Sequence, residues 1–191
     1  MKLNRDFYMQ NALEAARGLI GKVLVHNSGE GRTSGLIVEA EAYMGLEDMA
    51  SHAYNHRGRN GRTAAMYRQG GVAYMYLIYG MYHCFNVVTN VVNVPECVLI
   101  RGVRPIEGLE LMQKRRGLAA SAAVKKLCDG PGKLCLAFGL DMRHYGMDLL
   151  GDTLYIEDNC KEKFTVAASK RINMGKCGEA RDYLYRFTME P

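Results

Sequence analysis

Two glutamates two positions apart could supply a general base. Glu39 and Glu41 lie in the apolar stretch 37–43, and on a strand both would project from one face, because side chains alternate. A half-buried strand ordinarily turns its charges to solvent, so an exposed acidic pair is the simpler interpretation. In a partly dry pocket, burial would instead raise the pKa of a carboxylate and suit it to accept a proton. O-glycoside chemistry fits poorly, since the two carboxylates would lie side by side rather than across a bond.

A tyrosine-rich segment, residues 72–86, could stack against flat rings. Tyr74 and Tyr76 would share one strand face, whereas Tyr79 falls on the other, directly before Gly80, where an antiparallel pair would turn. Two aromatic rings on one face can hold a planar group, and a ring at a hairpin tip can act as a probe. Tyrosine also favours half-buried strands, so an ordinary β-core is the alternative interpretation.

Arginines flank this tyrosine-rich segment. Residues 55–105 contain six arginines and one acid, Glu96, so their net charge of +5 equals that of the whole chain. Cations beside stacking aromatics are typical of nucleic-acid grooves, although a solvated basic loop is also possible. The arginines are Arg57, Arg59, Arg62, Arg68, Arg101 and Arg104.

Other common catalytic patterns are missing from the sequence. His52 ends the stretch Glu-Asp-Met-Ala-Ser-His, but a lone histidine is more often a hydrogen-bonded structural residue than a catalyst. There is no Ser-His-Asp spacing and no Gly-x-Gly-x-x-Gly phosphate loop. The six cysteines form no Cys-x-x-Cys pair, which disfavours a zinc site, an iron–sulfur cluster or a disulfide scaffold. We therefore expect no metal and no cofactor.

A mostly antiparallel sheet is expected to position these residues. We predict strands at 22–26, 34–43, 72–79, 82–89, 96–103, 154–157 and 164–170, and a polar loop with at most one helical turn at 55–71. Helices are expected at 10–20, from Pro105 to about Arg116, near 122–128 and at 131–138. Hairpins outnumber βαβ patterns, which predicts an α+β fold: one domain over residues 1–191, with a curved sheet, flanking helices and a protruding β-hairpin.

Length and composition are those of a soluble globular protein. The chain has 191 residues, 48% hydrophobic and 24% charged, enough for one core. No apolar run approaches the roughly 20 residues of a membrane span, and the first residues lack the apolar core of a signal peptide. We expect a cytoplasmic monomer with no membrane partner.

Taken in order, a series of sequence blocks resembles the alkyladenine (3-methyladenine) DNA glycosylase family over roughly residues 5–175. The blocks are Val-Glu-Ala-Glu-Ala-Tyr, Glu-Asp-x-Ala-Ser-His, Tyr-x-Tyr-x-x-Tyr-Gly-Met-Tyr-x-Cys-x-Asn, Cys-Val-Leu-Ile-Arg-Gly, Pro-Ile-Glu-Gly-Leu and Gly-Pro-Gly-Lys-Leu-Cys. The chain departs from the pattern at Leu184, where relatives usually carry proline, which leaves the path of the last strand open.

The resemblance implies an enzyme of base excision repair. It would flip alkylated or deaminated purines out of damaged double-stranded DNA and excise them by hydrolysis. No lysine near these blocks stands out as a Schiff-base nucleophile, so we expect a monofunctional enzyme without lyase activity. The substrates of such enzymes include 3-methyladenine, 7-methylguanine, hypoxanthine and ethenoadenine, and the sequence does not select among them.

The same resemblance implies a role for each candidate residue. Glu41 would activate water, Arg101 would hold that water or a phosphate, and Glu39 would be structural. The base would be enclosed by Tyr43, His52 and Tyr76, with Asn86 at the pocket floor rejecting guanine. Tyr79 would enter the minor groove and fill the gap left by the base, and Met81 and Tyr82 would also contact DNA.

Three other functions remain open from the sequence. A damage-recognition protein would bind without cleaving and could dispense with Glu41. A single-strand binder could use the tyrosines as a stacking platform, but it would leave Glu41 and His52 without a role. A hydrolase that acts on RNA would present much the same pocket.

Overall fold

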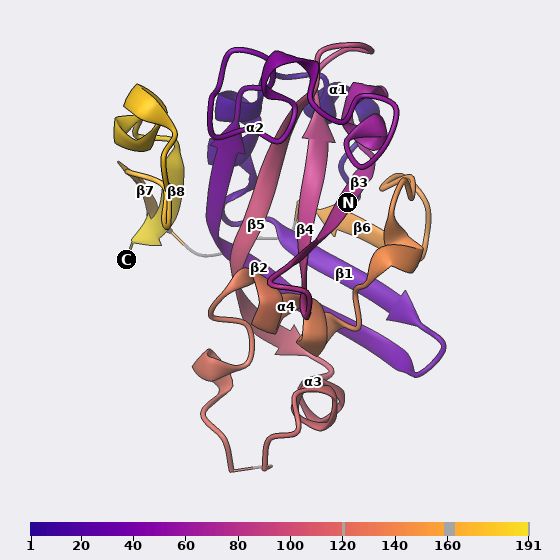
Figure 1. Ribbon diagram of the computed structural model, residues 1–191. Helices are drawn as coiled ribbons and strands as arrows, with labels where there is room; N and C mark the ends of the chain where they lie inside the picture. Colours follow the sequence, from indigo (N-terminus) through magenta and orange to yellow (C-terminus); the bar gives the residue numbers. More distant parts are fainter. Residues whose placement is uncertain (120, 159–162, 191) are drawn as a thin grey trace.

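An antiparallel sheet forms the centre of the protein in the computed structural model, which describes residues 1–119, 121–158 and 163–190 (Figure 1). Within these residues the sheet has eight strands in the order β3-β4-β5-β2-β1-β6, with β8 pairing with β2 and β7 pairing with β8. The elements are α1 (Arg5–Tyr8), α2 (Ala12–Leu19), β1 (Val23–Ser28), β2 (Gly31–Tyr43), η1 (Tyr54–His56), η2 (Ala64–Tyr67), β3 (Ala73–Ile78), β4 (Tyr82–Thr89), β5 (Glu96–Glu107), α3 (Leu109–Arg115), η3 (Val124–Lys126), α4 (Pro131–Phe138), η4 (Met142–His144), β6 (Leu154–Glu157), β7 (Thr165–Ser169), η5 (Gly178–Asp182) and β8 (Arg186–Glu190). The predicted α+β class is confirmed.

Helix α2 closes one face of the sheet against β2 and β5. Its buried residues, Ala12, Ala15, Ala16 and Leu19, recur at helical spacing and form one apolar stripe. The Asn11 side chain caps the helix by accepting the backbone N–H of Glu14, and the Glu96 carboxylate accepts the N–H of Ala12 at 2.7 Å. These bonds fix the start of β5 to the start of the helix.

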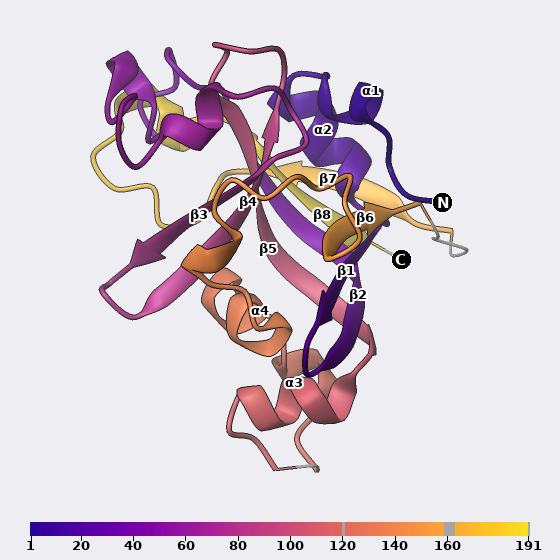
Figure 2. The ribbon, with the colours of Figure 1, turned by 90° about the vertical axis from the view of Figure 1, so that its right-hand side faces the viewer.

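Strands β3 and β4 form the predicted hairpin, which extends away from the other strands (Figure 2). Its turn is closed by a hydrogen bond from the Met81 N–H to the Ile78 carbonyl, 3.2 Å long. Tyr79 and Gly80 both have positive φ, 54° and 70°, as a type I′ turn requires. Glycine adopts this conformation readily, whereas tyrosine does so at a cost in free energy. Tyr79 lies at the tip of the hairpin with 75% of its surface exposed.

Three predictions about local structure are wrong. The segment from Pro105 to Glu107 continues β5 and pairs with β2, because a register shift between Ser34 and Gly35 accommodates the proline. Helix α3 starts only at Leu109, after Gly108 (φ 78°). The predicted helix at 122–128 is reduced to the short η3. The loop at 55–71 contains η2 and overlaps η1, so it has more than the single helical turn that was predicted.

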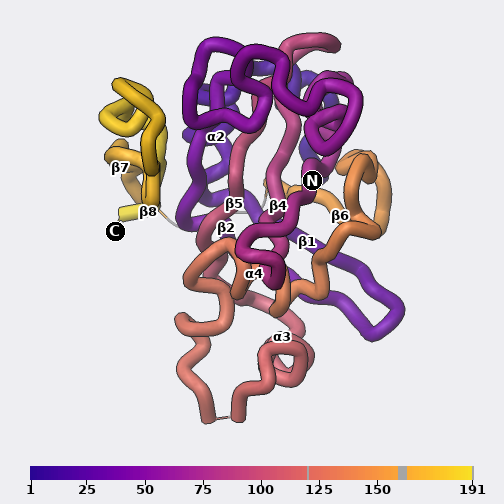
Figure 3. The backbone as a smooth tube through the Cα atoms, in the orientation of Figure 1, coloured from indigo at the N-terminus to yellow at the C-terminus, as the bar shows by residue number. Residues whose placement is uncertain are grey.

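The C-terminal hairpin of β7 and β8 lies beside β2 (Figure 3). Strand β1 pairs with the first half of β2, and β8 continues along the same strand over residues 39–41. The leucine at position 184 is exposed and precedes β8, so the departure from the family pattern does not prevent this pairing.

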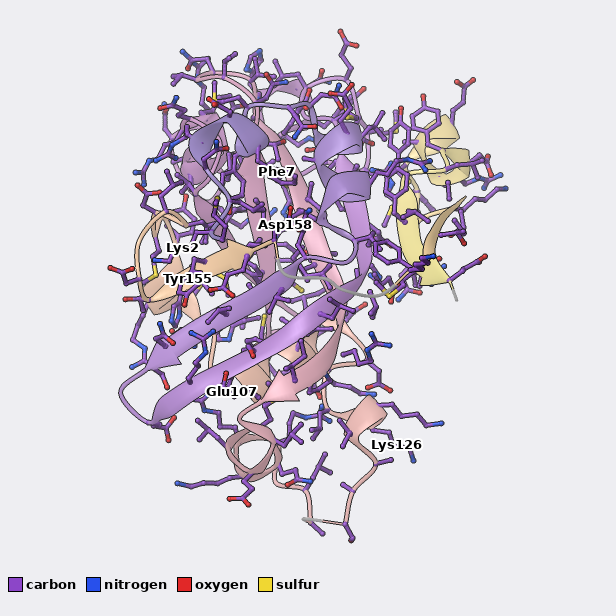
Figure 4. All side chains as sticks on the ribbon, turned by 180° about the vertical axis from the view of Figure 1, so that it is seen from behind. Lys2, Phe7, Glu107, Lys126, Tyr155 and Asp158 are labelled. Atoms are coloured by element: carbon purple, nitrogen blue, oxygen red, sulfur yellow. The ribbon has the colours of Figure 1, made fainter. Side chains whose placement is uncertain are left out.

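The N-terminal residues lie against β6, as seen from behind in Figure 4. The Leu3 N–H donates to the Ile156 carbonyl, and the ammonium of Lys2 sits 4.2 Å from the centre of the Tyr155 ring. Among the described residues, no helix is long and apolar enough to cross a membrane.

Candidate active site

A cavity of about 870 Å³ lies between the β3–β4 hairpin, β5, the start of α4 and residues 172–174. Of the nine candidate residues taken from the sequence, Glu41 and Met81 do not line it. The other seven do: Tyr43, His52, Tyr76, Tyr79, Tyr82, Asn86 and Arg101. The fold therefore gathers in one place side chains that come from four separate parts of the chain.

Glu41 is fully buried directly behind the cavity wall. One carboxylate oxygen accepts the Tyr43 hydroxyl at 2.9 Å, and the other accepts the backbone N–H of Ile172 at 2.7 Å. Nε of Arg101 lies 3.4 Å from that second oxygen. All three contacting residues line the cavity, so the carboxylate is one side chain away from it.

Burial raises the pKa of Glu41 above the ordinary glutamate value. The Arg101 charge and the hydrogen bonds from the Ile172 N–H and the Tyr43 hydroxyl lower the pKa of Glu41 and offset part of this rise. The carboxylate is therefore a better proton acceptor than a solvated glutamate, while donors still hold its orientation. This is the combination that a general base needs.

Glu39 shares Arg101 with Glu41. Its carboxylate accepts from Nε of Arg101 at 3.0 Å and from Nε of Arg186 at 2.7 Å, and its side chain is only 20% exposed. Register shifts on either side of Glu39 let both carboxylates reach one arginine, which pairs two acids from β2 with cations from β5 and β8. The simpler interpretation of an exposed acidic pair is wrong.

Aromatic side chains form another part of the cavity wall. The ring centres of Tyr74 and Tyr76 are 5.7 Å apart, as expected for one strand face, and the His52 ring lies 4.5 Å from that of Tyr76. His52 Nδ1 is 2.8 Å from the Tyr74 hydroxyl. Burial and the nearby Arg62 charge lower the pKa of His52 to about 4, so the imidazole is neutral near pH 7.

Asn86 is held at the base of this aromatic wall. It is 2% exposed, lies opposite Tyr74 in the β3–β4 register, and donates from Nδ2 to the Tyr74 carbonyl at 3.1 Å. Cys84 lies two residues away on the same face, and burial raises the pKa of its thiol. The amide is thus fixed in a dry part of the cavity.

The hairpin tip presents apolar side chains to solvent. Met81 is 64% and Tyr82 is 40% exposed, next to the even more exposed Tyr79. Gly132, at the start of α4, packs against the Tyr82 side chain, since a Cβ at this glycine would come within 3.0 Å of it. Neighbouring exposed apolar groups are typical of surfaces that bind a partner.

The arginine-rich loop borders the same cavity. Arg57 and Arg59 are exposed and lie over the rings of Tyr54 and Tyr67, 5.3 and 4.9 Å from the ring centres. Arg62 is exposed and lines the cavity. Of the six arginines that give this segment its charge, Arg62 and Arg101 line the cavity itself.

Two contributions to the site could not be read from the sequence. The Ile172 donor is a backbone group, which no residue pattern marks, and the Tyr74 hydroxyl orients His52 although the side chain itself is 1% exposed. Within the described chain, no group of three or more histidine, cysteine or acidic side chains could hold a metal ion. The five cysteines described are free and buried; Cys160 lies outside the described residues.

Comparisons with known proteins agree on one family. The profile of the family described as methylpurine-DNA glycosylase matches residues 6–191. A protein of Clostridium tetani is 48% identical over 100% of this chain and 96% of its own length, and one of Clostridium acetobutylicum is 46% identical over 98% and 93%. A third, from Bacillus cereus, is 43% identical over 98% and 95%. All three carry the name "Putative 3-methyladenine DNA glycosylase".

Proposed function

This chain belongs to the methylpurine-DNA glycosylase family, and we propose that it excises alkylated or deaminated purines from duplex DNA with a water molecule activated by Glu41. The observation that carries the proposal is the buried carboxylate of Glu41, with its raised pKa, one side chain behind an aromatic cavity that opens beside an exposed hairpin tip and a basic loop.

In this proposal the flipped purine stacks between aromatic side chains. Tyr43 and Tyr76 offer ring faces, and neutral His52 offers a hydrogen bond to the edge of the base through its second ring nitrogen, because Nδ1 is engaged by the Tyr74 hydroxyl. A volume of about 870 Å³ is ample for a nucleotide and falls within the usual range of small-molecule sites. Electron-poor lesion bases stack well on such rings.

The proposed chemistry is hydrolysis of the N-glycosidic bond. The oxygen of water bonds to the anomeric carbon, its proton passes to Glu41, and the base departs with the electrons of the broken bond. Alkylation at N3 or N7 makes the purine cationic, so it leaves as a neutral molecule. Hypoxanthine and ethenoadenine carry no such charge, so they leave as anions that take up a proton from solvent water. Arg101 stabilises the ionised carboxylate and orients the water, which reaches Glu41 once the Arg101 guanidinium shifts aside.

The exposed tip would carry out extrusion. Tyr79 enters the minor groove and occupies the space of the flipped base, which repays part of an unstacking cost of a few kcal/mol. Met81 and Tyr82 would then contact the flanking nucleotides. Asn86 would disfavour unmodified guanine, because the exocyclic amino group of guanine would meet an amide fixed in a dry site. 7-Methylguanine carries the same amino group, but its cationic ring makes it a better leaving group, which offsets this penalty.

The test is excision by a Glu41→Gln variant. The wild-type chain should leave an alkali-labile site in duplexes that carry hypoxanthine or 7-methylguanine. The variant should bind the same duplexes with similar affinity but cleave about 10²- to 10⁴-fold more slowly, the usual contribution of a general base.

Glu107→Gln provides the matched control. This glutamate is exposed, pairs with Arg32 at the end of β5 (Figure 4), does not line the cavity and should be dispensable for excision. Undiminished cleavage by the Glu41→Gln protein would remove Glu41 from the mechanism. Tight binding by a wild-type chain that leaves no abasic site would indicate a damage-recognition protein instead.

A further inference from the structure

A buried ion pair lies directly behind the residues that contact Glu41. The side chains of Arg171 and Asp48 are 0% and 1% exposed, and the two Nη groups of Arg171 donate to the two oxygens of Asp48 at 2.5 and 2.9 Å. The same Nη groups also donate to the carbonyls of Ala42 and Ala180, at 2.9 and 3.0 Å. One guanidinium therefore ties together the end of β2, the segment that follows it and the C-terminal region.

Asp48 extends this connection to the chain leading into the aromatic wall. Its carboxylate accepts the backbone N–H groups of Met44 and Ala50, at 3.1 and 3.0 Å. Residues 44–50 are thereby folded around a single side chain, and His52 follows two residues later.

Arg171 also reaches both groups that hydrogen-bond Glu41. Its guanidinium carbon lies 4.7 Å from the ring centre of Tyr43, whose hydroxyl donates to one carboxylate oxygen. The next residue in the chain is Ile172, whose N–H donates to the other oxygen. A second ring, that of Tyr185, lies 5.2 Å from the guanidinium carbon.

We propose that Arg171, held by Asp48, is a positioning residue that keeps the Tyr43 hydroxyl and the Ile172 amide in place on Glu41. The proposal rests on the proposed function, in which Glu41 takes the proton of water. Neither member of the ion pair touches the substrate; both act through the groups that surround the carboxylate.

A purely stabilising role is a poor explanation for this pair. Removing two charges from water costs about as much as their attraction returns, so buried ion pairs add little to stability compared with apolar residues of similar size. A bidentate arginine does provide fixed geometry, because its planar donors match a carboxylate. Here the fixed groups are those that set the orientation of Glu41 and the affinity of Glu41 for protons.

Arg171→Lys tests the proposal because it keeps the positive charge but cannot reproduce four directed hydrogen bonds. Arg5→Lys is the matched control: Arg5 donates to both oxygens of Asp148 and to the Gly70 carbonyl, and none of these residues lines the cavity. The first measurement needs no DNA. Hydrogen exchange of the Ile172 amide, followed by NMR, should be at least about tenfold faster in Arg171→Lys and unchanged in Arg5→Lys, since a tenfold change corresponds to a modest local opening.

The second measurement is single-turnover excision of hypoxanthine at saturating enzyme across a pH series. We expect the rate near pH 7 to fall by about 10- to 100-fold in Arg171→Lys, while the affinity for the duplex changes less than about threefold, because the loss is one of geometry. The acidic limb of the profile should also move to higher pH. The Ile172 hydrogen bond lowers the pKa of Glu41, and its weakening lets that pKa rise. A double variant, Asp48→Asn with Arg171→Gln, removes both charges together. It replaces Arg171→Lys in both measurements if the lysine variant does not fold.

Unchanged exchange at Ile172 overturns the proposal whatever the enzyme does to DNA. A variant with a smaller active fraction but a wild-type pH profile also overturns it, because that result is what a merely structural residue gives. Absence of excision by the wild-type chain refutes the proposed function instead, and the exchange measurement then decides alone whether Arg171 anchors Ile172.

Discussion

Replacing Tyr79 by glycine separates the role of this residue in the hairpin from its proposed role in DNA. Tyr79 is 75% exposed. An aromatic side chain buries about 150–250 Å² when enclosed, so the remaining quarter is about 40–60 Å², worth roughly 1–1.5 kcal/mol at 25 cal/mol per Å². Its left-handed φ of 54° costs a non-glycine residue about 1–2 kcal/mol.

These two contributions nearly cancel in Tyr79→Gly, which loses the contacts but relieves the backbone. We expect its free energy of unfolding to stay within about 1 kcal/mol of wild type. Tyr79→Ala keeps the unfavourable φ and loses the contacts, so it should be less stable than the glycine variant by about 1 kcal/mol. Urea denaturation measures both values.

Both variants should extrude the lesion poorly despite their intact fold. Stopped-flow fluorescence of 2-aminopurine next to the lesion reports extrusion, and single-turnover excision reports its consequence. Tyr74→Ala is the reference for a core tyrosine, since Tyr74 is 1% exposed and its loss should cost about 3–5 kcal/mol. If Tyr79→Gly destabilises the protein by a similar amount, or if extrusion is unaffected by either variant, Tyr79 does not fill the space of the flipped base as proposed.

Two further predictions concern solution conditions. DNA affinity should fall steeply with salt, and Arg62→Gln should reduce the slope of log K against log [salt] by about 0.9, the value for one phosphate contact. An unchanged slope would exclude Arg62 from the DNA surface. Stability should fall as pH drops below about 6.5, because burial lowers the pKa of His26, so the unfolded chain takes up its proton before the folded one. His26 Nδ1 donates to the Phe138 carbonyl at 2.7 Å, which leaves Nε2 to accept from Nε2 of His144 at 3.2 Å; urea denaturation of His26→Asn between pH 7 and 5 should show a weaker pH dependence than wild type.

Local sequence patterns predicted those elements whose partners are close along the chain. The β3–β4 hairpin follows from alternation around Gly80, and α4 follows from a proline at its first position, so both could be predicted with nearly the observed bounds. The helix predicted from Pro105 onwards was wrong because the prediction considered only the local pattern. A proline with a glutamate two residues later is typical of a helix start, but here a distant strand, β2, continues the ladder and keeps β5 extended as far as Glu107.

The candidate site shows the same limit. The side chains at the cavity surface could be found because chemistry restricts their types, and Tyr43, His52 and Arg101 do line the cavity. The contact of Ile172 with Glu41 joins residues 131 positions apart through a backbone amide, for which any residue except proline would serve. Arg171 could not be predicted as part of the site, because no sequence pattern marks this arginine as buried.

The pairing of β8 with β2 also determines when the site is complete during synthesis. Glu39 emerges from the ribosome 147 residues before its partner Arg186, an interval of roughly 7–30 s at 5–20 residues per second. Through this interval the second half of β2 lacks β8 as its neighbour, and through most of it Glu41 lacks the Ile172 amide, which follows Glu41 by 131 residues. A nascent chain therefore holds a carboxylate that is not yet oriented. The contacts that orient both glutamates of β2 therefore depend on β8 and the segment before it, which are synthesised last among the described elements.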